Sequence, residues 1–170
     1  MRFLFIILII LLFLLYFKHY ISPTKQFSIV QLSLSKVEPS FLFEKNPIII
    51  NEPIMSPLQL TDTLFKYLFV RKLQSLECTP SIFNQNKSRY AILYPRHRND
   101  SIRIVHPKKS RYLKKATDES LKQIDYVEVR LMKRQVIILP MYWWYQVDNC
   151  NFGCIDLDDT FSFLRKKIQM

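Results

Sequence analysis

The sequence contains little glycine, histidine, cysteine or acid, and each shortage narrows what the chain is expected to be. Among 170 residues Gly153 is the one glycine, so we expect its tight turns to use Asn or Asp at positive φ, or to be replaced by longer loops. The three cysteines form no evident disulfide framework, and Cys150 and Cys154 have neither the spacing nor the second ligand pair of a zinc site. We expect them to be buried or incidental.

Acidic residues are outnumbered, 14 to 25, by lysine and arginine, which gives a net charge of +11. Residues 96–115 hold ten Lys, Arg or His residues and one acid. This segment is interpreted in one of two ways. It forms solvated loops and strand faces, or it binds anionic groups, among which lipid head groups are the nearest for a protein anchored in a membrane. No nucleic-acid fold signature accompanies the charge, so a nucleic acid partner is not expected. The candidate anion-binding residues are Arg96, Arg98, Lys108, Lys109 and Arg111.

An uninterrupted apolar run occupies residues 3–17. Fifteen helical residues cover about 22 Å, and continuing to residue 21 brings the helix close to the roughly 30 Å of a bilayer core. Because no small-residue cleavage site follows, an uncleaved anchor is favoured over a signal peptide. Lysines beyond the run favour a cytoplasmic domain, while Asn86 and Asn99 begin glycosylation sequons that leave the topology open.

The length suits one domain with an appendage. We expect a transmembrane anchor at residues 1–21, a juxtamembrane linker or edge strand at residues 22–39, and one folded domain at residues 40–170. The protein is then a single-pass membrane protein.

The periodicity of the folded part predicts mostly strands. A capping box at residues 56–59, with proline at the first helical position, predicts a helix over residues 57–73. Charge placement predicts a second helix over residues 156–168. Strands are predicted at residues 46–50, 89–94, 101–105, 126–132 (alternating and half-exposed) and 136–139 (apolar on both faces), with a last strand ending near residue 147. The fold class is therefore mainly β (α+β), a small barrel or sandwich with helical additions.

Both tryptophans of the chain lie in the segment "ILPMYWWYQV", residues 138–147. On a strand, Trp143 and Tyr145 share one face while Tyr142 and Trp144 share the other. Such large aromatic residues serve as a fold-defining core or as a docking surface. The candidate pocket or fold-defining residues are Thr79, Pro140, Tyr142, Trp143 and Trp144.

This segment resembles a known family. The stretch "VEVRLMKRQVIILPMYWWYQV" is similar to the closing strands of the cupin-like proteins related to JmjC oxygenases, in which "LPxYWWHxV" carries an iron-binding histidine. Upstream, "IRIVHPKKSRYL" and "KNPIII" are similar to earlier strands of the family, so the resemblance covers roughly residues 40–147. It implies a double-stranded β-helix, or jelly-roll. Cupin-like chains with an N-terminal anchor occur among large DNA viruses, which implies a virion or host membrane as the location.

The resemblance also implies where metal ligands would stand. The family's His-x-Asp follows Thr-Pro, which places its ligands at Ile82 and Asn84, and its last histidine falls on Tyr145. All three residue types differ from the family's, which implies a degenerate pseudo-oxygenase with no metal and no cofactor. It would act in binding or as a structural component. The family's turn before the double-Trp strand, commonly Gly-Asp, is Arg134-Gln135 here.

Two alternatives stay open. One is a 2-oxoglutarate- and Fe(II)-dependent hydroxylase with a rebuilt metal site made of His97, Asp100 and His106, in which Arg96, Arg98 or neither binds the cosubstrate. The other is a sugar- or nucleotide-binding module that uses the emptied barrel. Fold alone does not choose among these functions.

Overall fold

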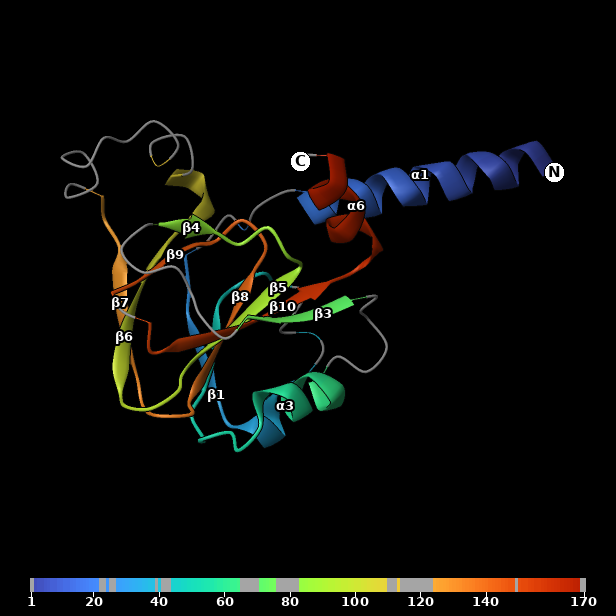
Figure 1. The fold of residues 1–170 in the computed structure, drawn as a ribbon. Helices are drawn as coiled ribbons and strands as arrows, with labels where there is room; N and C mark the ends of the chain where they lie inside the picture. Colours follow the sequence, from blue (N-terminus) through green and yellow to red (C-terminus); the bar gives the residue numbers. More distant parts are fainter. Residues whose placement is uncertain are drawn as a thin grey trace.

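Two β-sheets and a few helices make up the part of the chain that the structure, a computed structural model, describes (Figure 1). The described residues are 2–21, 24, 27–38, 40, 44–64, 71–75, 83–109, 113, 124–148 and 150–168. Among these residues the structure gives the helices α1 (Arg2–Ile21), α3 (Pro57–Leu64) and α6 (Thr160–Ile168), with short 3-10 helices η1 (Leu34–Lys36) and η2 (Pro107–Lys109).

The sheets have six and four strands. The six-stranded sheet is ordered β1 (Val30–Leu32), β2 (Ile48–Ile50), β8 (Val136–Pro140), β5 (Tyr90–Pro95), β10 (Phe152–Asp158), β3 (Arg71–Ser75). The four-stranded sheet is ordered β4 (Asn84–Gln85), β9 (Trp144–Val147), β6 (Asp100–Val105), β7 (Val127–Leu131). The pair β1–β2 is parallel, and the other neighbouring strands pair antiparallel.

The main core lies between the two sheets. Its buried side chains include Leu93, Ile137 and Leu139 from the six-stranded sheet and Ile102, Ile104 and Leu131 from the four-stranded sheet. Burying an aliphatic side chain of this size stabilises the fold by about 1.5–3 kcal/mol. A second cluster covers the outer face of the larger sheet, where Leu60 of α3 and Leu34 of η1 pack on it.

The periodicity of the middle strands is confirmed. In β8, Ile137 and Leu139 face the core between the sheets while Val136 and Ile138 face the outer cluster, which explains why this strand is apolar on both sides. Burial alternates along β7, whose Glu128 and Arg130 are exposed. The predicted half-exposed strand is therefore present.

Both predicted helices have wrong boundaries. Helix α3 ends at Leu64, and Arg71–Ser75 forms β3, which pairs with β10; residues 65–70 lie outside the described residues. The predicted second helix loses residues 156–158 to β10, which pairs with β5 and β3 on its two sides. Asp159 caps α6 instead, accepting a hydrogen bond from the Ser162 N–H at 2.8 Å. At residues 71–73 and at residues 156–158, pairing between β3 and β10 outweighs the local sequence signals for a helix.

The predicted transmembrane anchor is wrong. Within the part of the chain that the structure describes, no helix is both long enough and apolar enough to cross a membrane. The apolar run is shorter than a bilayer core, and the last turn of α1 is engaged by the body of the protein. Tyr20 is 4% exposed and donates a hydrogen bond to Asp159 Oδ1 at 2.6 Å, and Phe17 packs on Phe161. The predicted location, a single-pass membrane protein, is therefore also wrong.

The predicted fold class is also wrong as stated. It combined a mainly β, cupin-like double-stranded β-helix with a membrane-spanning helix in front. The structure is mixed α/β, with two sheets and few helices. The C-terminal part of α1 packs on α6 through Phe13, Phe17 and Phe161, while the rest of α1 projects away from the sheets (Figure 1).

The turns differ from expectation. The non-glycine residues with positive φ among those described are Lys45 (φ 60°), Arg134 (φ 65°) and Tyr142 (φ 75°), and none is Asn or Asp. Gly153 does not have a positive φ, so no turn requires a glycine at this position. A Cβ at Gly153 would lie 2.5 Å from Cζ of Tyr94, so the glycine permits a close approach of strand and ring.

Candidate functional site

The aromatic segment divides between two sides of the four-stranded sheet. Trp143 is fully buried between the sheets, and its ring N–H donates to the Lys45 carbonyl at 2.9 Å. Tyr145 packs against the same core. Trp144 packs with Val105 on the outer face of the sheet. The predicted division of faces is confirmed for Trp143, Tyr145 and Trp144, whereas Tyr142 lies in the turn before β9 and not on a strand.

Two of the former metal-ligand positions are adjacent. Asn84 of β4 lies directly opposite Tyr145 of β9 in the antiparallel pairing. Direct cross-strand partners project to one face, so the Asn84 side chain shares the inward face of Tyr145. Ile82 and Thr79 lie outside the described residues.

The alternative iron site is not assembled. Asp100 begins β6 and His106 follows its last residue, so the two are separated by about 20 Å of extended strand. Asp100 accepts a hydrogen bond from the Asn151 amide at 2.9 Å, and His106 Nδ1 accepts one from the Lys108 N–H at 3.1 Å. Among the described residues, no group of three or more His, Cys, Asp or Glu side chains could hold a metal ion.

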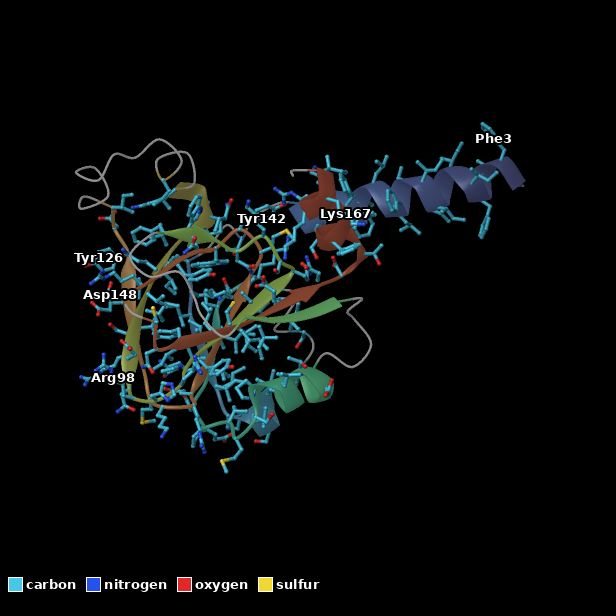
Figure 2. The ribbon with its side chains drawn as sticks, viewed as in Figure 1. Phe3, Arg98, Tyr126, Tyr142, Asp148 and Lys167 are labelled. Carbon is cyan, nitrogen blue, oxygen red and sulfur yellow. The ribbon has the colours of Figure 1, made fainter. Side chains whose placement is uncertain are left out.

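The candidate anion-binding residues form two groups. Arg96 and Arg98 lie in the loop between β5 and β6, which Asn151 fastens by donating to the Arg98 carbonyl at 3.0 Å. Lys108 and Lys109 lie in η2, at the other end of β6. Figure 2 places Arg98 at the opposite end of this sheet from Tyr126, the residue that precedes β7. Arg111 lies outside the described residues.

A hollow of about 460 Å³, called the polar pocket below, lies where β4, the turn before β9 and α6 meet. Its lining includes Gln85, Lys87, Tyr142, Trp144 and Arg165. Tyr142 projects toward α6 (Figure 2). The lining also includes Asn84, so three of its residues, Asn84, Tyr142 and Trp144, are candidates from the sequence. Gln85, Lys87 and Arg165 are not, because they come from a two-residue strand, a loop and a terminal helix.

Tyr142 is held from several sides in an unusual conformation. The Arg165 guanidinium lies 4.7 Å from the ring centroid and donates a hydrogen bond to the phenol oxygen. The Tyr142 N–H donates to the Asn86 carbonyl at 2.9 Å, and the Gln85 amide donates to the Tyr142 carbonyl at 3.3 Å. Positive φ costs a bulky residue about 1–2 kcal/mol, and such strain is concentrated at binding sites and clamps.

The Tyr142 phenol in the polar pocket is neutral at ordinary pH. Burial raises the pKa of Tyr142 above its ordinary value, and the positive charges of Arg165 and Arg89 offset part of that rise. The phenol therefore stays protonated near neutral pH. With the guanidinium of Arg165 beside it, the site presents hydrogen-bond donors and positive charge.

Asn86 builds the pocket's frame. Its side-chain amide donates to the Leu139 carbonyl at 2.8 Å, and its side-chain oxygen accepts from the Ser88 N–H at 2.9 Å. The residue is 3% exposed, so the sequon that it begins is folded into the structure. These bonds fix the end of β4, which carries Gln85, and the following loop, which carries Lys87, against the end of β8.

Comparison with models of protein families and with curated proteins found no match for this sequence. The resemblance to the cupin-like family stays a prediction from its motifs.

Proposed function

We propose that the protein is a non-catalytic binding protein whose polar pocket holds an anionic sugar, a sugar ring that carries a phosphate or a carboxylate. The observation that carries the proposal is the composition of the lining: three aromatic rings, amide groups and two cations surround one hollow of about 460 Å³. No acid is among the lining residues that the structure describes. Pockets with a few convergent polar groups on a fixed frame are the usual sites of small ligands.

The uncharged part of the lining suits a sugar ring. Tyr142, whose ring is covered on one side by Arg165, and the 8% of Trp144 that is exposed give the hollow aromatic edges against which the C–H groups of such a ring can pack. The amide of Gln85 has both donors and an acceptor for hydroxyl groups. Because Tyr142 is fixed at positive φ by its contacts with Asn86 and Arg165, this wall is already formed before a ligand arrives.

The charged part of the lining suits the anionic substituent. Arg165 has five N–H donors in a planar fork, so it can keep its bond to Tyr142 and still bind a carboxylate or phosphate. Lys87 is exposed at the same hollow and adds a second positive charge. Bonds between charged partners are about twice as strong as neutral ones, which gives the anion its preference.

The same lining supports binding over chemistry. Hydrolysis of a glycosidic bond uses a pair of carboxylic acids, and the described lining of the polar pocket carries none. Asn84 and Tyr145 stand where the resemblance implies a carboxylate and a histidine, and a neutral amide with a phenol is a poor pair of ligands for a divalent ion.

The test is calorimetric titration of the full chain with glucose 6-phosphate, glucuronate, glucose and inorganic phosphate. We expect one of the two anionic sugars to bind, and glucose and phosphate to bind at least tenfold more weakly. Arg165→Met and Gln85→Ala should each weaken binding about tenfold, or about 1.4 kcal/mol. Arg98→Met and Gln31→Ala are the matched controls, since both residues are exposed and lie away from the pocket.

Two results would overturn the proposal. One is that neither anionic sugar binds more tightly than glucose. The other is that Arg98→Met weakens binding as much as Arg165→Met does, since binding would then reflect net charge and not the pocket.

A further inference from the structure

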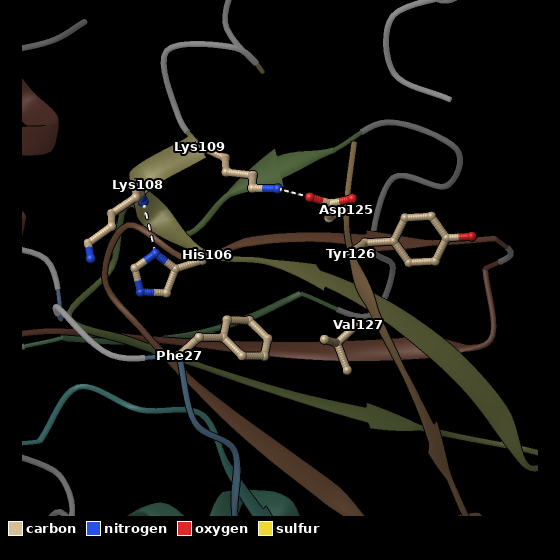
Figure 3. Close-up of a pocket in the computed structure, with 7 residues that line it drawn as sticks. All are labelled: Phe27, His106, Lys108, Lys109, Asp125, Tyr126 and Val127. Atoms are coloured by element: carbon tan, nitrogen blue, oxygen red, sulfur yellow. Dashed lines mark hydrogen bonds and ion pairs between the residues drawn. The ribbon is translucent and has the colours of Figure 1, made fainter. Parts of the chain in front are cut away.

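A second hollow, of about 370 Å³, lies between β7 and η2 (Figure 3). Tyr126, one of its lining residues, lies at the end of the four-stranded sheet far from Arg98 (Figure 2). The hollow is called the basic-rimmed pocket below. Its described lining combines an apolar floor of Phe27 and Val127 with a rim of Lys108, Lys109 and Asp125. The proposed function uses none of these residues.

The floor is continuous with the main core. The Phe27 ring lies 5.5 Å from Trp143 and 5.9 Å from His106, measured between centroids. His106 in turn meets Trp143 edge-on at 5.2 Å, and Val127 packs against the core between the sheets. Phe27 is nevertheless 46% exposed, so a large apolar surface faces the hollow and the solvent. Covering such surface favours binding by roughly 25 cal/mol per Å².

The histidine in this wall is held in one tautomer. His106 Nδ1 accepts the Lys108 backbone N–H at 3.1 Å, so the proton of the neutral ring lies on Nε2. The same bond fixes η2, and with it the two lysines of the rim. Figure 3 shows the His106 and Phe27 rings side by side below the lysines.

The rim is positive and its one acid is weakly held. Lys109 forms an ion pair with Asp125, whose side chain is 90% exposed, and Lys108 is exposed beside them. The hydrogen bond from Lys109 lowers the pKa of Asp125, which stays ionised at neutral pH. An exposed ion pair contributes little to stability, so another carboxylate or a phosphate can replace Asp125 on Lys109.

We propose that the basic-rimmed pocket binds an amphipathic anion, a short aliphatic chain that ends in a carboxylate or a phosphate. The chain lies on Phe27 and Val127, and the head group is bound by Lys108 and Lys109. The site is independent of the polar pocket, because the two hollows share no described lining residue.

The experiment titrates the full chain with octanoate, octyl phosphate and octyltrimethylammonium. A Trp144→Phe background leaves Trp143 as the single tryptophan, so its fluorescence reports on the floor. The test variants are Lys108→Glu for the rim and Phe27→Ala for the floor. Lys133→Glu is the control, because it makes the same charge change in the turn at the other end of β7.

We expect saturable binding of octanoate or octyl phosphate, and the stronger of the two identifies the head group. Lys108→Glu and Phe27→Ala should each weaken that binding at least tenfold, while Lys133→Glu changes it less than twofold. Arg165→Met, which tests the polar pocket, should leave it unchanged.

The proposal is overturned if the cationic probe binds as tightly as the anions, or if neither anion binds. It is also overturned if Lys133→Glu weakens binding as much as Lys108→Glu, since the charge of the whole protein would then account for it. Because Lys108 is exposed, a loss of folding does not complicate the first variant, and Phe27→Ala tests the floor separately.

Discussion

Asn84 and Tyr145 lie directly opposite each other, as partners in the antiparallel pairing of β4 with β9. The sequence places them 61 residues apart, and the resemblance to the cupin-like family makes both of them positions of metal ligands. Tyr145 packs against the core between the sheets, so its ring occupies space on the inward face. The pairing therefore places two neighbouring side chains where two metal ligands could be introduced by substitution.

Replacing both residues should therefore create a weak zinc site. In the double variant Asn84→Asp, Tyr145→His, a carboxylate and an imidazole extend from Cα atoms about 4.5–5.5 Å apart, within reach of one ion at about 2.0–2.2 Å. We expect Zn²⁺ to raise the thermal midpoint of this variant, because a ligand at about 100 times its Kd stabilises a fold by about 2.7 kcal/mol. Differential scanning calorimetry with and without Zn²⁺ measures the gain.

The control for that variant is Asn84→Asp with Gln146→His. Gln146 follows Tyr145 in β9, so its side chain projects to the other face of the sheet and cannot share an ion with residue 84. An equal response to Zn²⁺ in the two double variants would show that the pairing does not place residues 84 and 145 together.

Gly153→Ala should destabilise the protein strongly, because the added methyl group would clash with a buried ring. The new Cβ would lie 2.5 Å from Cζ of Tyr94, and this ring is only 9% exposed, so it cannot swing away into solvent. Overpacking of this kind costs about 1–3 kcal/mol. Urea unfolding gives the free energy of unfolding of the variant and of the wild type.

A double-mutant cycle separates this clash from other effects of the added methyl group. In a Tyr94→Leu background the shorter side chain leaves room, and Gly153→Ala should then cost less than about 0.5 kcal/mol. If the cost is the same in both backgrounds, the ring is not the obstacle, and the contact between Gly153 and Tyr94 is disproved.

The sequence predicts the central strands well because their pattern reflects which faces are buried. Alternation at residues 126–132 and a doubly apolar run at residues 136–139 are direct consequences of a half-exposed and a fully buried strand. The division of Trp143 and Trp144 between two faces follows from the same period of two. These features are local, so one stretch of sequence contains all the information required.

The features that the sequence does not predict depend on distant partners. Strand β3 and residues 154–158 of β10 become strands by pairing with each other across some 80 residues, and β4 consists of two residues only. The polar pocket joins Gln85, Tyr142 and Arg165, which no local pattern connects. Likewise, the apolar run at residues 3–17 predicts a membrane anchor. The contact that buries Tyr20 under Arg89 depends on a residue about 70 positions away, which this run does not reveal.

Arg134→Gly should stabilise the protein. Arg134 has φ 65°, a conformation that costs an ordinary residue about 1–2 kcal/mol and costs glycine nothing. Glycine loses more backbone entropy on folding, about 0.5–1 kcal/mol, so the net gain is about 0.5–1 kcal/mol. The thermal midpoint should rise by about 1–4 °C. Lys133→Gly in the same turn is the control; because Lys133 has no positive φ, a rise there as well would contradict the explanation.

The stability of the protein should rise with pH on account of Lys45. Burial, together with the positive charge of Arg89, lowers the pKa of this half-buried lysine from 10.5 to about 8. Between these values the unfolded chain binds more protons than the folded protein, so the free energy of unfolding increases with pH. This contribution is complete above the unfolded pKa and is lost as the pH falls through the folded pKa.

Lys45→Met isolates this contribution. The variant has no charge to bury, so it should be more stable than the wild type at about pH 7, and the difference should shrink by about pH 9.5. The range stops there because the pKa of Tyr20 is raised by burial and its hydrogen bond to Asp159, which lowers stability above about pH 10. Urea unfolding at each pH measures the difference. Lys36→Met, at an exposed lysine of η1, should follow the wild-type profile at a constant offset, and a constant offset for Lys45→Met would contradict the buried ammonium.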